Sequence, residues 1–562
     1  MKLRVGAGAG VLAVIIYAGT LAPAAHAQTV DPLAGSTDQS SALALEARMA
    51  DHLHYGLMWE QLYNTPARVA GDIETIEDPD DVALYTGNYL GAEAYRYGLA
   101  KREIAAKHDV AFWTGQRDEA LARVTAMVHQ YHILINISGS WQTKLDPKIN
   151  TSESPTQDGY INIGGGVFEG QPGLLFRSCV PVKAPAAFDL AKQTTPTRFV
   201  DDLAWPPPLY PWVHASPGDA TAYNCDGATS RDAYAGTTFG LATALDLVGP
   251  DDAALRSMIA NDLITLTAFT FQYAWGTPRP TGQVVIPVVF GGNDLDGVYS
   301  PLFDYDPAAE MNLAQVALHA SEVLGNTVQE VKWNAVWLSE LTTQLPALTA
   351  SLLQDVYQPH DSFYKFHLDY LNLFDLIRLE PNAVVRDQMR EALAALDATT
   401  GQDVDGLFDA LVYSLTGSPS RMAAAVSEEQ GWLAYKARLE TVSGDTDNSQ
   451  DCGTPPAPGK IDCVPETQTQ VVQPLPGGLP PLVTTLAGNG GSRSLTPLPV
   501  EDRPGTDFLW QKDPTNLDSN EPANWEPPGD DFLLPYWMLR YYSEAAPPTV
   551  DPLPAWLGPS FS

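Results

Sequence analysis

One cluster of polar residues stands where an apolar helix is expected to begin, and it carries the side chains of acid–base chemistry. The cluster contains Arg231, Asp232 and Tyr234 and follows Ser230, which can cap the helix. A carboxylate there can act as a general acid or base, and an arginine can anchor hydroxyl or carboxylate groups. A tyrosine can stack on a sugar ring or move a proton. Asp232 and Tyr234 are therefore catalytic candidates and Arg231 is a substrate-binding candidate. The alternative is that Arg231 and Asp232 pair with neighbouring residues at the rim.

A second polar cluster precedes the aromatic helix that contains Tyr85 and Asn88. Asp78, Asp80 and Asp81 lie immediately before it. Such acids cap a helix and complement its dipole, or they place a carboxylate at a binding funnel. Asp81 lies closest to the aromatic opening and is the second catalytic candidate, while Tyr85 and Asn88 are substrate-binding candidates.

Further substrate-binding candidates lie on loops and on later helices. Arg177, in an apolar loop, is a substrate ligand or part of a structural salt bridge. His360 and Asp369 lie at or near the opening of an apolar helix, where polar residues line a wet funnel or form a satisfied buried network. Trp141 and Trp537 offer flat surfaces on which sugars stack.

The sequence predicts neither a metal site nor a cofactor. His129 and His132 share a helix face, but no glutamate motif accompanies them. The acidic runs 294–297 and 445–448 resemble fragments of calcium loops without the closing glutamate. The sequence also has no nucleophile elbow, P-loop or dinucleotide fingerprint.

The amino terminus and the cysteines indicate export to the periplasm or the medium. Residues 1–27 have the charged, apolar and small-residue order of a secretory signal. Four cysteines suit an oxidising compartment. Cys452 and Cys463 are close in sequence and form the simplest pair, which leaves Cys179 with Cys225, although four cysteines allow three connectivities.

The charge of the chain excludes some partners. Its formal net charge is −36, so nucleic acid and anionic lipid are not expected to bind. Highly sulfated or polyuronic substrates are disfavoured for the same reason. No segment after the signal reaches the ~20 apolar residues that a membrane span needs.

Periodicity and punctuation predict a single helical domain over residues 28–545, followed by a tail at 546–562. Long irregular stretches interrupt it at 138–229, 275–305 and 443–530, and residues 443–500 form a Pro/Gly-rich excursion within the domain. Apolar helices with few charges alternate with amphipathic, charged ones, which favours two concentric rings. Twelve helices are predicted, near 40–62, 84–104, 109–137, 230–247, 251–274, 306–325, 329–355, 362–379, 381–397, 404–417, 421–441 and 531–543.

Six hairpins of alternating inner and outer helices resemble the (α/α)6 toroid of many glycoside hydrolases, several polysaccharide lyases and sugar epimerases. The resemblance covers residues 40–545 with the loops set aside, and no catalytic signature accompanies it. It implies an all-α fold whose substrate enters a funnel at one end. Transferred to this chain, that location lies around Asp81, Arg231, His360 and Asp530.

Three functions are consistent with these features. The first is an exported glycoside hydrolase that uses Asp81 and Asp232 as paired carboxylates on a glycan or oligosaccharide. The second is a polysaccharide lyase with Tyr234 as base and Arg231 or Arg177 neutralising a uronate carboxylate. The third is a toroid that binds glycans or peptides without catalysis. The sequence does not predict an oligomeric state.

Overall fold

The computed structural model describes most of the helical part of the chain. The predicted signal 1–27 and the predicted tail 546–562 lie outside the described residues. The described residues are 33, 36–69, 71–77, 81–136, 231–274, 307–355, 363–400, 405–441, 492–503, 509–517 and 524–544, with shorter pieces between 173 and 226 and between 463 and 486.

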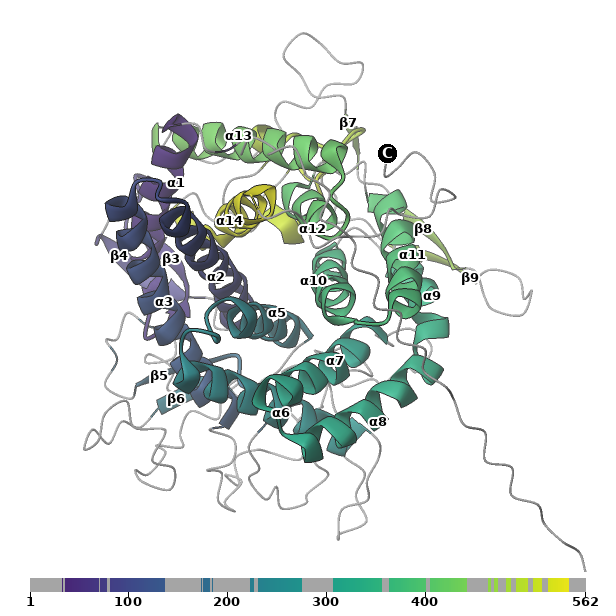
Figure 1. Ribbon diagram of the computed structural model, residues 1–562. Coiled ribbons are helices and arrows are strands. Elements are labelled where there is room, and N and C mark those ends of the chain that lie inside the picture. The colour runs from purple at the N-terminus through teal and green to yellow at the C-terminus, as the bar shows by residue number, and fades with distance from the viewer. Residues whose placement is uncertain are drawn as a thin grey trace, which may run out of the picture.

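Six of the described helices surround a common axis (Figure 1). Each of them contacts the next in chain order, and the last contacts the first, so these contacts form a closed cycle. The inner helices are α2 (Val82–Ala106), α5 (Arg231–Leu247), α7 (Pro307–Leu324), α10 (Tyr364–Leu379), α12 (Gly406–Thr416) and α14 (Asp530–Glu544).

A second layer of helices lies outside the first (Figure 1). Short connections make α3, α6, α8, α11 and α13 each run back along the inner helix that precedes it. The outer helices are α1 (Ser36–Met49), α3 (Val110–Asn136), α6 (Ala253–Ala274), α8 (Thr327–Thr343), α9 (Leu345–Asp355), α11 (Ala383–Thr400) and α13 (Pro419–Thr441).

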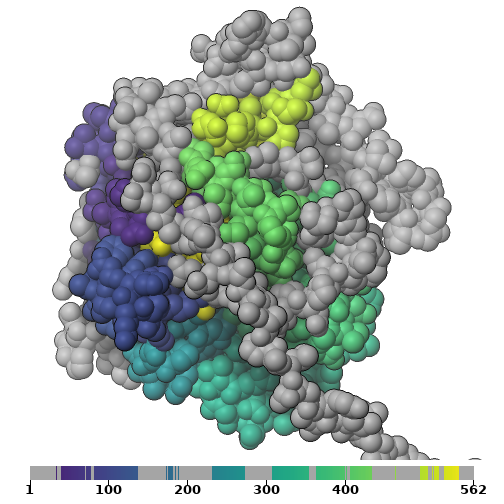
Figure 2. All heavy atoms as spheres, turned by 45° about the horizontal axis from the view of Figure 1, so that its top comes forward, coloured from purple at the N-terminus to yellow at the C-terminus, as the bar shows by residue number. Residues whose placement is uncertain are grey.

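The two layers differ in burial as their sequences predict. The inner helix α2 is buried on nearly all sides between Val82 and Ala100. The outer helix α8 buries Trp333, Trp337 and Glu340 and exposes Val328. A helix without a solvated face must be covered on all sides, whereas a helix with one apolar stripe packs that stripe on the inner layer and exposes its other face to solvent. In the space-filling view (Figure 2), only small patches of the yellow α14 are visible between neighbouring segments.

Glycines set the closest contact in the ring, between α2 and α5. A Cβ atom on Gly87 would lie 2.0 Å from the carbonyl oxygen of Gly236. A Cβ atom on Gly240 would lie 2.4 Å from the carbonyl oxygen of Gly87. Only glycine permits the two backbones to approach this closely.

The amino- and carboxy-terminal parts of the chain close the ring together. Helix α1 packs against α13 and α14. Arg48 pairs with Glu526 at 2.5 Å, and strand β11 (Trp525–Glu526) adds to β3 (Glu60–Tyr63). The ring therefore closes by contacts between segments about five hundred residues apart in sequence.

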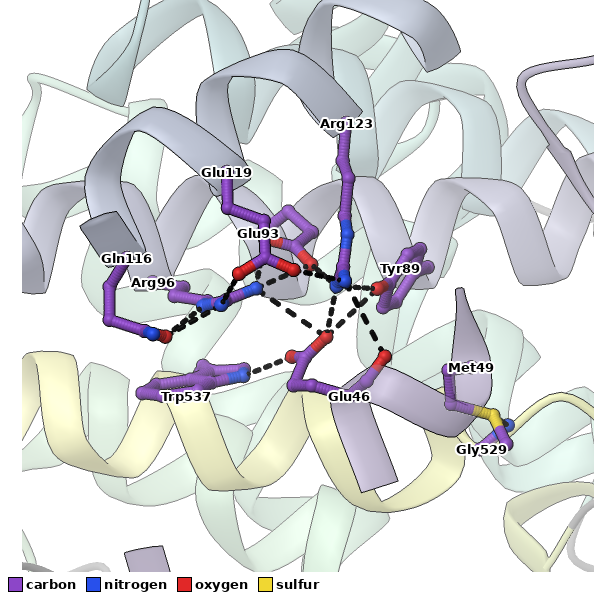
Figure 3. A network of polar contacts seen from close by, with 10 residues as sticks. All are labelled: Glu46, Met49, Tyr89, Glu93, Arg96, Gln116, Glu119, Arg123, Gly529 and Trp537. Carbon is purple, nitrogen blue, oxygen red and sulfur yellow. Dashed lines mark hydrogen bonds and ion pairs between the residues drawn. The ribbon is translucent and has the colours of Figure 1, made fainter. Parts of the chain in front are cut away.

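Glu46 of α1 is the centre of this closure (Figure 3). Its carboxyl group accepts a hydrogen bond from the indole of Trp537 at 2.6 Å and from the hydroxyl of Tyr89 at 2.9 Å. Arg123 of α3 also donates to it. Burial and the neighbouring Glu93 raise the pKa of Glu46 to about 7. Helices α2, α3 and α14 thus each donate a hydrogen bond to one buried carboxyl group of α1.

Two arginines link Glu46 to further carboxylates (Figure 3). Arg123 donates to Glu93 at 2.7 Å, and Arg96 donates to Glu93 at 3.1 Å and to Glu119 at 2.8 Å. The network holds three carboxyl groups and two guanidinium groups, so one carboxyl group is in excess, in agreement with the raised pKa of Glu46.

Helix α14 contains a proline, and its neighbour compensates for it. Pro535 has no N–H group for the carbonyl oxygen of Asp531, four residues earlier. The indole N–H of Trp510 donates to that oxygen instead. The helix therefore continues through the proline with the carbonyl satisfied.

Short strands occupy parts of the long connections. Strand β3 pairs antiparallel with β4 and with β11, and β5 pairs antiparallel with β6. The remaining elements are β1 (Leu53–His54), β2 (Leu57–Met58), β4 (Ile73–Glu77), β5 (Ser178–Pro181), β6 (Tyr223–Asp226), β7 (Cys463–Pro465), β8 (Thr469–Gln473), β9 (Leu482–Leu486), β10 (Ser492–Ser494), η6 (Val500–Asp502) and η7 (Leu509–Gln511).

The predicted all-α class is confirmed, and two predicted helices are corrected. The helix predicted at 40–62 ends at Met49, because Tyr55 and Gly56 have positive φ angles and turn the chain into strands. The helix predicted at 329–355 is divided at Gln344 into α8 and α9. Among the described helices, none combines the length and the apolar character that a bilayer crossing requires.

Candidate functional site

Charged groups from three inner helices meet at the carboxy-terminal end of the ring. Arg378 of α10 pairs with Asp246 of α5 and, at 2.9 Å, with Asp375. His319 of α7 contacts Asp246 at 2.7 Å. Burial opposes ionisation of Asp246, but Arg378 and His319 lower its pKa to about 2. We call Asp246, His319, Asp375 and Arg378 the ion-pair layer.

Two tyrosines extend the ion-pair layer to the other side of the axis. Burial raises the pKa of Tyr95 of α2, and Tyr542 of α14 contributes in the same direction. Arg378 lowers the pKa of both tyrosines, so both lie near its guanidinium. Five inner helices therefore contribute side chains to this end.

Polar residues spaced by seven positions continue the same helix face from the ion-pair layer toward the amino-terminal ends of the helices. Seven residues make almost two turns, so such residues lie above one another. In α2, the residue seven before Tyr95 is Asn88, and seven before that is Asp81. In α5, Asp232 lies fourteen residues before Asp246 on the same face.

Asparagines form a middle level on this inward face. The amide nitrogen of Asn312 donates to Asn372 at 3.0 Å and to the hydroxyl of Thr238 at 3.2 Å. His319 lies seven residues after Asn312, which ties the two levels together. Asn88, Asn312 and Asn372 are at most 2% exposed. We call these three residues the amide layer.

Asp530 lies at the amino-terminal end of α14 and is fully buried. Burial raises its pKa well above the ordinary value, and the neighbouring Asp531 raises it further. Asn88 acts in the opposite direction by a hydrogen bond that lowers the pKa, although the contact does not have regular hydrogen-bond geometry. Asp530 is therefore next to Asn88 of the amide layer, and its burial beside Asp531 favours the protonated carboxyl. We call Asp81, Asp232 and Asp530 the carboxyl layer.

More carboxyl groups lie behind Asp530, between α12, α13 and α14. Burial raises the pKa of Glu429 well above its ordinary value, with Asp531 and Glu428 as further causes. Burial also raises the pKa of Glu428 to about 7, despite the nearby Arg503. Asp531 connects these acids to Asp530, because it raises the pKa of both Glu429 and Asp530.

The predicted catalytic residues lie at the starts of their helices. Asp81 precedes α2 and makes no capping hydrogen bond through its side chain. Asp232 is in the first turn of α5 and is half-buried, while Arg231 and Tyr234 beside it are buried. Tyr85 is buried in the first turn of α2.

The other predicted residues are scattered. Arg177 is buried immediately before β5, and Asp369 is buried one turn before Asn372 in α10. Trp537 is fully buried and donates to Glu46, so its indole belongs to the ring closure rather than to the inward face. Trp141, His360 and Cys452 lie outside the described residues.

The register of β5 and β6 places Cys179 directly opposite Cys225. This backbone pairing suits the expected disulfide, whose formation stays a prediction. Cys463 is buried in β7.

No protein-family model, curated protein or solved structure matches this chain. The site is therefore interpreted from its own residues. Within the described residues, no group of three or more His, Cys, Asp or Glu side chains has an arrangement suited to a metal ion.

Sequence reasoning identified Asn88 of the amide layer as a candidate but missed Asn312 and the whole ion-pair layer. The sequence does contain a signal for both layers, because Asn312 and His319 stand seven residues apart in an otherwise apolar helix. Asp246 and Arg378 stand near the ends of their helices, where charge is expected without any function. The seven-residue spacing becomes informative only when several helices are compared.

Proposed function

We propose that the protein is an exported glycoside hydrolase built on an (α/α)6 toroid, with its acid–base chemistry in the carboxyl layer. The cycle of six inner helices and the second layer outside it support this fold. Helices α14 and α1 would be the sixth hairpin, formed by the two ends of the chain.

The observation that carries the proposal is the state of Asp530. A glycosidase needs one carboxyl group that stays protonated until it protonates the leaving oxygen. Burial beside Asp531 raises the pKa of Asp530 well above its ordinary value, as that role requires. Asp530 also lies next to Asn88 on the inward face, where a bound sugar would be enclosed. We assign Asp530 as the general acid.

Asp232 is the proposed partner carboxylate. It is half-buried in the first turn of α5, where the helix dipole favours its charged form. Both carboxyl groups lie in the first turn of an inner helix, and α5 packs against α2, which packs against α14. Asp81 lies between them in helix order and is the alternative base.

The remaining candidates have supporting roles. Arg231 and Tyr234 flank Asp232 and would hold substrate hydroxyl groups. The net charge of −36 fits a neutral glycan better than a polyanionic one.

The test is hydrolysis of soluble neutral glycans by the secreted protein. We expect Asp530→Asn and Asp232→Asn each to lower kcat/KM by roughly 100-fold or more, because each removes proton transfer. The exposed Asp118→Asn on α3 serves as the control and should leave kcat/KM unchanged. Unsaturated products absorbing in the ultraviolet, or full activity in both variants, would overturn the assignment.

A further inference from the structure

The amide layer has hydrogen-bonding groups for which the described part of the chain supplies no regular partner. Within the described residues, neither the oxygen nor the nitrogen of the Asn88 amide has a regular hydrogen-bond partner. The same holds for the oxygen of Asn312 and the nitrogen of Asn372. Asn312 and Asn372 thus each keep one polar atom in reserve, and Asn88, whose polar neighbour is Asp530, has no regular partner for either atom.

Such groups are costly in a folded protein. A buried polar group without a partner destabilises the fold by about 1–3 kcal/mol, so most are paired. An apolar residue at these positions would avoid the cost. Three buried amides whose unmet polar atoms come from three inner helices therefore indicate a ligand that supplies the missing partners.

The amide groups also define the chemistry of that ligand. They are neutral and offer donors and acceptors together, which suits hydroxyl groups. The nearby charges of the ion-pair layer are paired with one another, at 2.7 Å for His319 with Asp246 and 2.9 Å for Arg378 with Asp375. The layer therefore has no spare charge to balance an ionic ligand.

The ion-pair layer connects several inner helices on the far side of the amides. Arg378 reaches Asp246 on another inner helix, and the tyrosines of α2 and α14 lie near the same guanidinium. Seven residues of helix span about 10 Å, so the amide layer lies roughly that far above the ion-pair layer and that far below Asp81. A chain entering between the carboxyl groups would end at the amides.

We propose that Asn88, Asn312 and Asn372 form a terminal subsite that holds one neutral sugar unit, so that the enzyme removes units from chain ends. This inference rests on the proposed function for the direction of entry. Binding of the sugar itself does not depend on catalysis.

The experiment is isothermal titration of the full-length protein with single sugars. The probes are D-glucose, D-galactose, D-mannose, D-xylose and N-acetyl-D-glucosamine, with D-glucuronate and D-glucosamine as charged comparisons. We expect at least one neutral sugar to bind. Asn88→Leu should weaken that binding about tenfold or more, because each lost hydrogen bond is worth roughly 1 kcal/mol or more.

A folding defect is distinguishable from loss of the subsite. Asn88→Leu removes no regular hydrogen bond, so its thermal midpoint should equal or exceed that of the wild type. Asn372→Leu is the second variant, and the exposed Asn334→Leu on α8 is the matched control, which should bind normally.

Three results would overturn the inference. They are no binding of any of the five neutral sugars, unchanged binding in both Asn88→Leu and Asn372→Leu, and equal binding of the charged sugars. Hydrolysis that releases mid-chain fragments would contradict the terminal subsite but keep the proposed function. Sugar binding without hydrolysis of any glycan would contradict the proposed function but keep the sugar-binding site.

Discussion

Replacing Glu46 should weaken the closure of the ring. Glu46 is 1% exposed and accepts hydrogen bonds from Trp537, Tyr89 and Arg123. Its removal leaves these donors facing one another in a dry junction. Loss of one partner from a buried charged network costs about 3–5 kcal/mol, which we expect for Glu46→Ala. Glu46→Gln keeps the shape and one acceptor oxygen, so about 1–3 kcal/mol is expected.

Urea unfolding at neutral pH measures these differences, and limited proteolysis reports the release of α1. Glu119→Gln is the matched control, because Glu119 bonds to the same two arginines but is 45% exposed. An exposed pair contributes at most about 1 kcal/mol. If Glu46→Ala unfolds like the wild type and α1 stays resistant to protease, the closure does not depend on this carboxyl.

The network also predicts a pH dependence. The pKa of Glu46 is raised to about 7 in the folded protein, mainly by burial. The folded state therefore binds the proton more tightly than the unfolded state. The stability that Glu46 contributes is fully present below its unfolded pKa of about 4.5 and is lost as pH rises through 7. The difference between wild type and Glu46→Gln should shrink between pH 5 and pH 8, and a constant difference would contradict the protonated carboxyl.

Three further changes test other parts of the structure. Gly87→Ala should lower the free energy of unfolding in urea by more than about 2 kcal/mol, because its Cβ would lie 2.0 Å from a carbonyl oxygen. The control is Gly115→Ala in α3, whose Cβ would have nothing within 4 Å and which should stabilise the protein by about 0.5–1 kcal/mol. Equal effects of the two substitutions would refute the close contact between α2 and α5. The pKa of Asp246 is lowered to about 2, so its contribution is present above about pH 4 and lost as pH falls toward 2; Asp246→Asn should flatten acid unfolding in that range, and an unchanged acid profile would argue against the ion-pair layer. Cys179→Ser should cost about 2–4 kcal/mol, and non-reducing peptide mapping should link Cys179 to Cys225, whereas a free thiol at Cys179 would exclude the bond.

Sequence reasoning found most helices because their signals are local. The polar start at Arg231 and the apolar run through Leu245 identify α5, and its boundaries agree within a residue. The return of the chain at α14 is equally predictable from its apolar residues. The helix predicted at 40–62 was too long because the residue pattern still looks helical across Tyr55 and Gly56, where the chain in fact turns.

The site was less predictable, because it depends on which helix faces meet. Trp537 has the residue type of a sugar-stacking platform, yet its indole donates to Glu46 five hundred residues away in sequence. Asn312 attracts no attention in an apolar helix until Asn372 is seen 3.0 Å away. Asp530 is an ordinary helix-start acid until its burial beside Asp531 is known. These properties come from packing between distant segments.

The most direct test of the account compares wild type and Asp530→Asn for release of reducing ends from a set of neutral glycans. The account predicts that the wild type hydrolyses at least one of them, and that Asp530→Asn folds normally with kcat/KM lower by roughly 100-fold or more. No hydrolysis by the wild type, or equal rates for the two proteins, would contradict it.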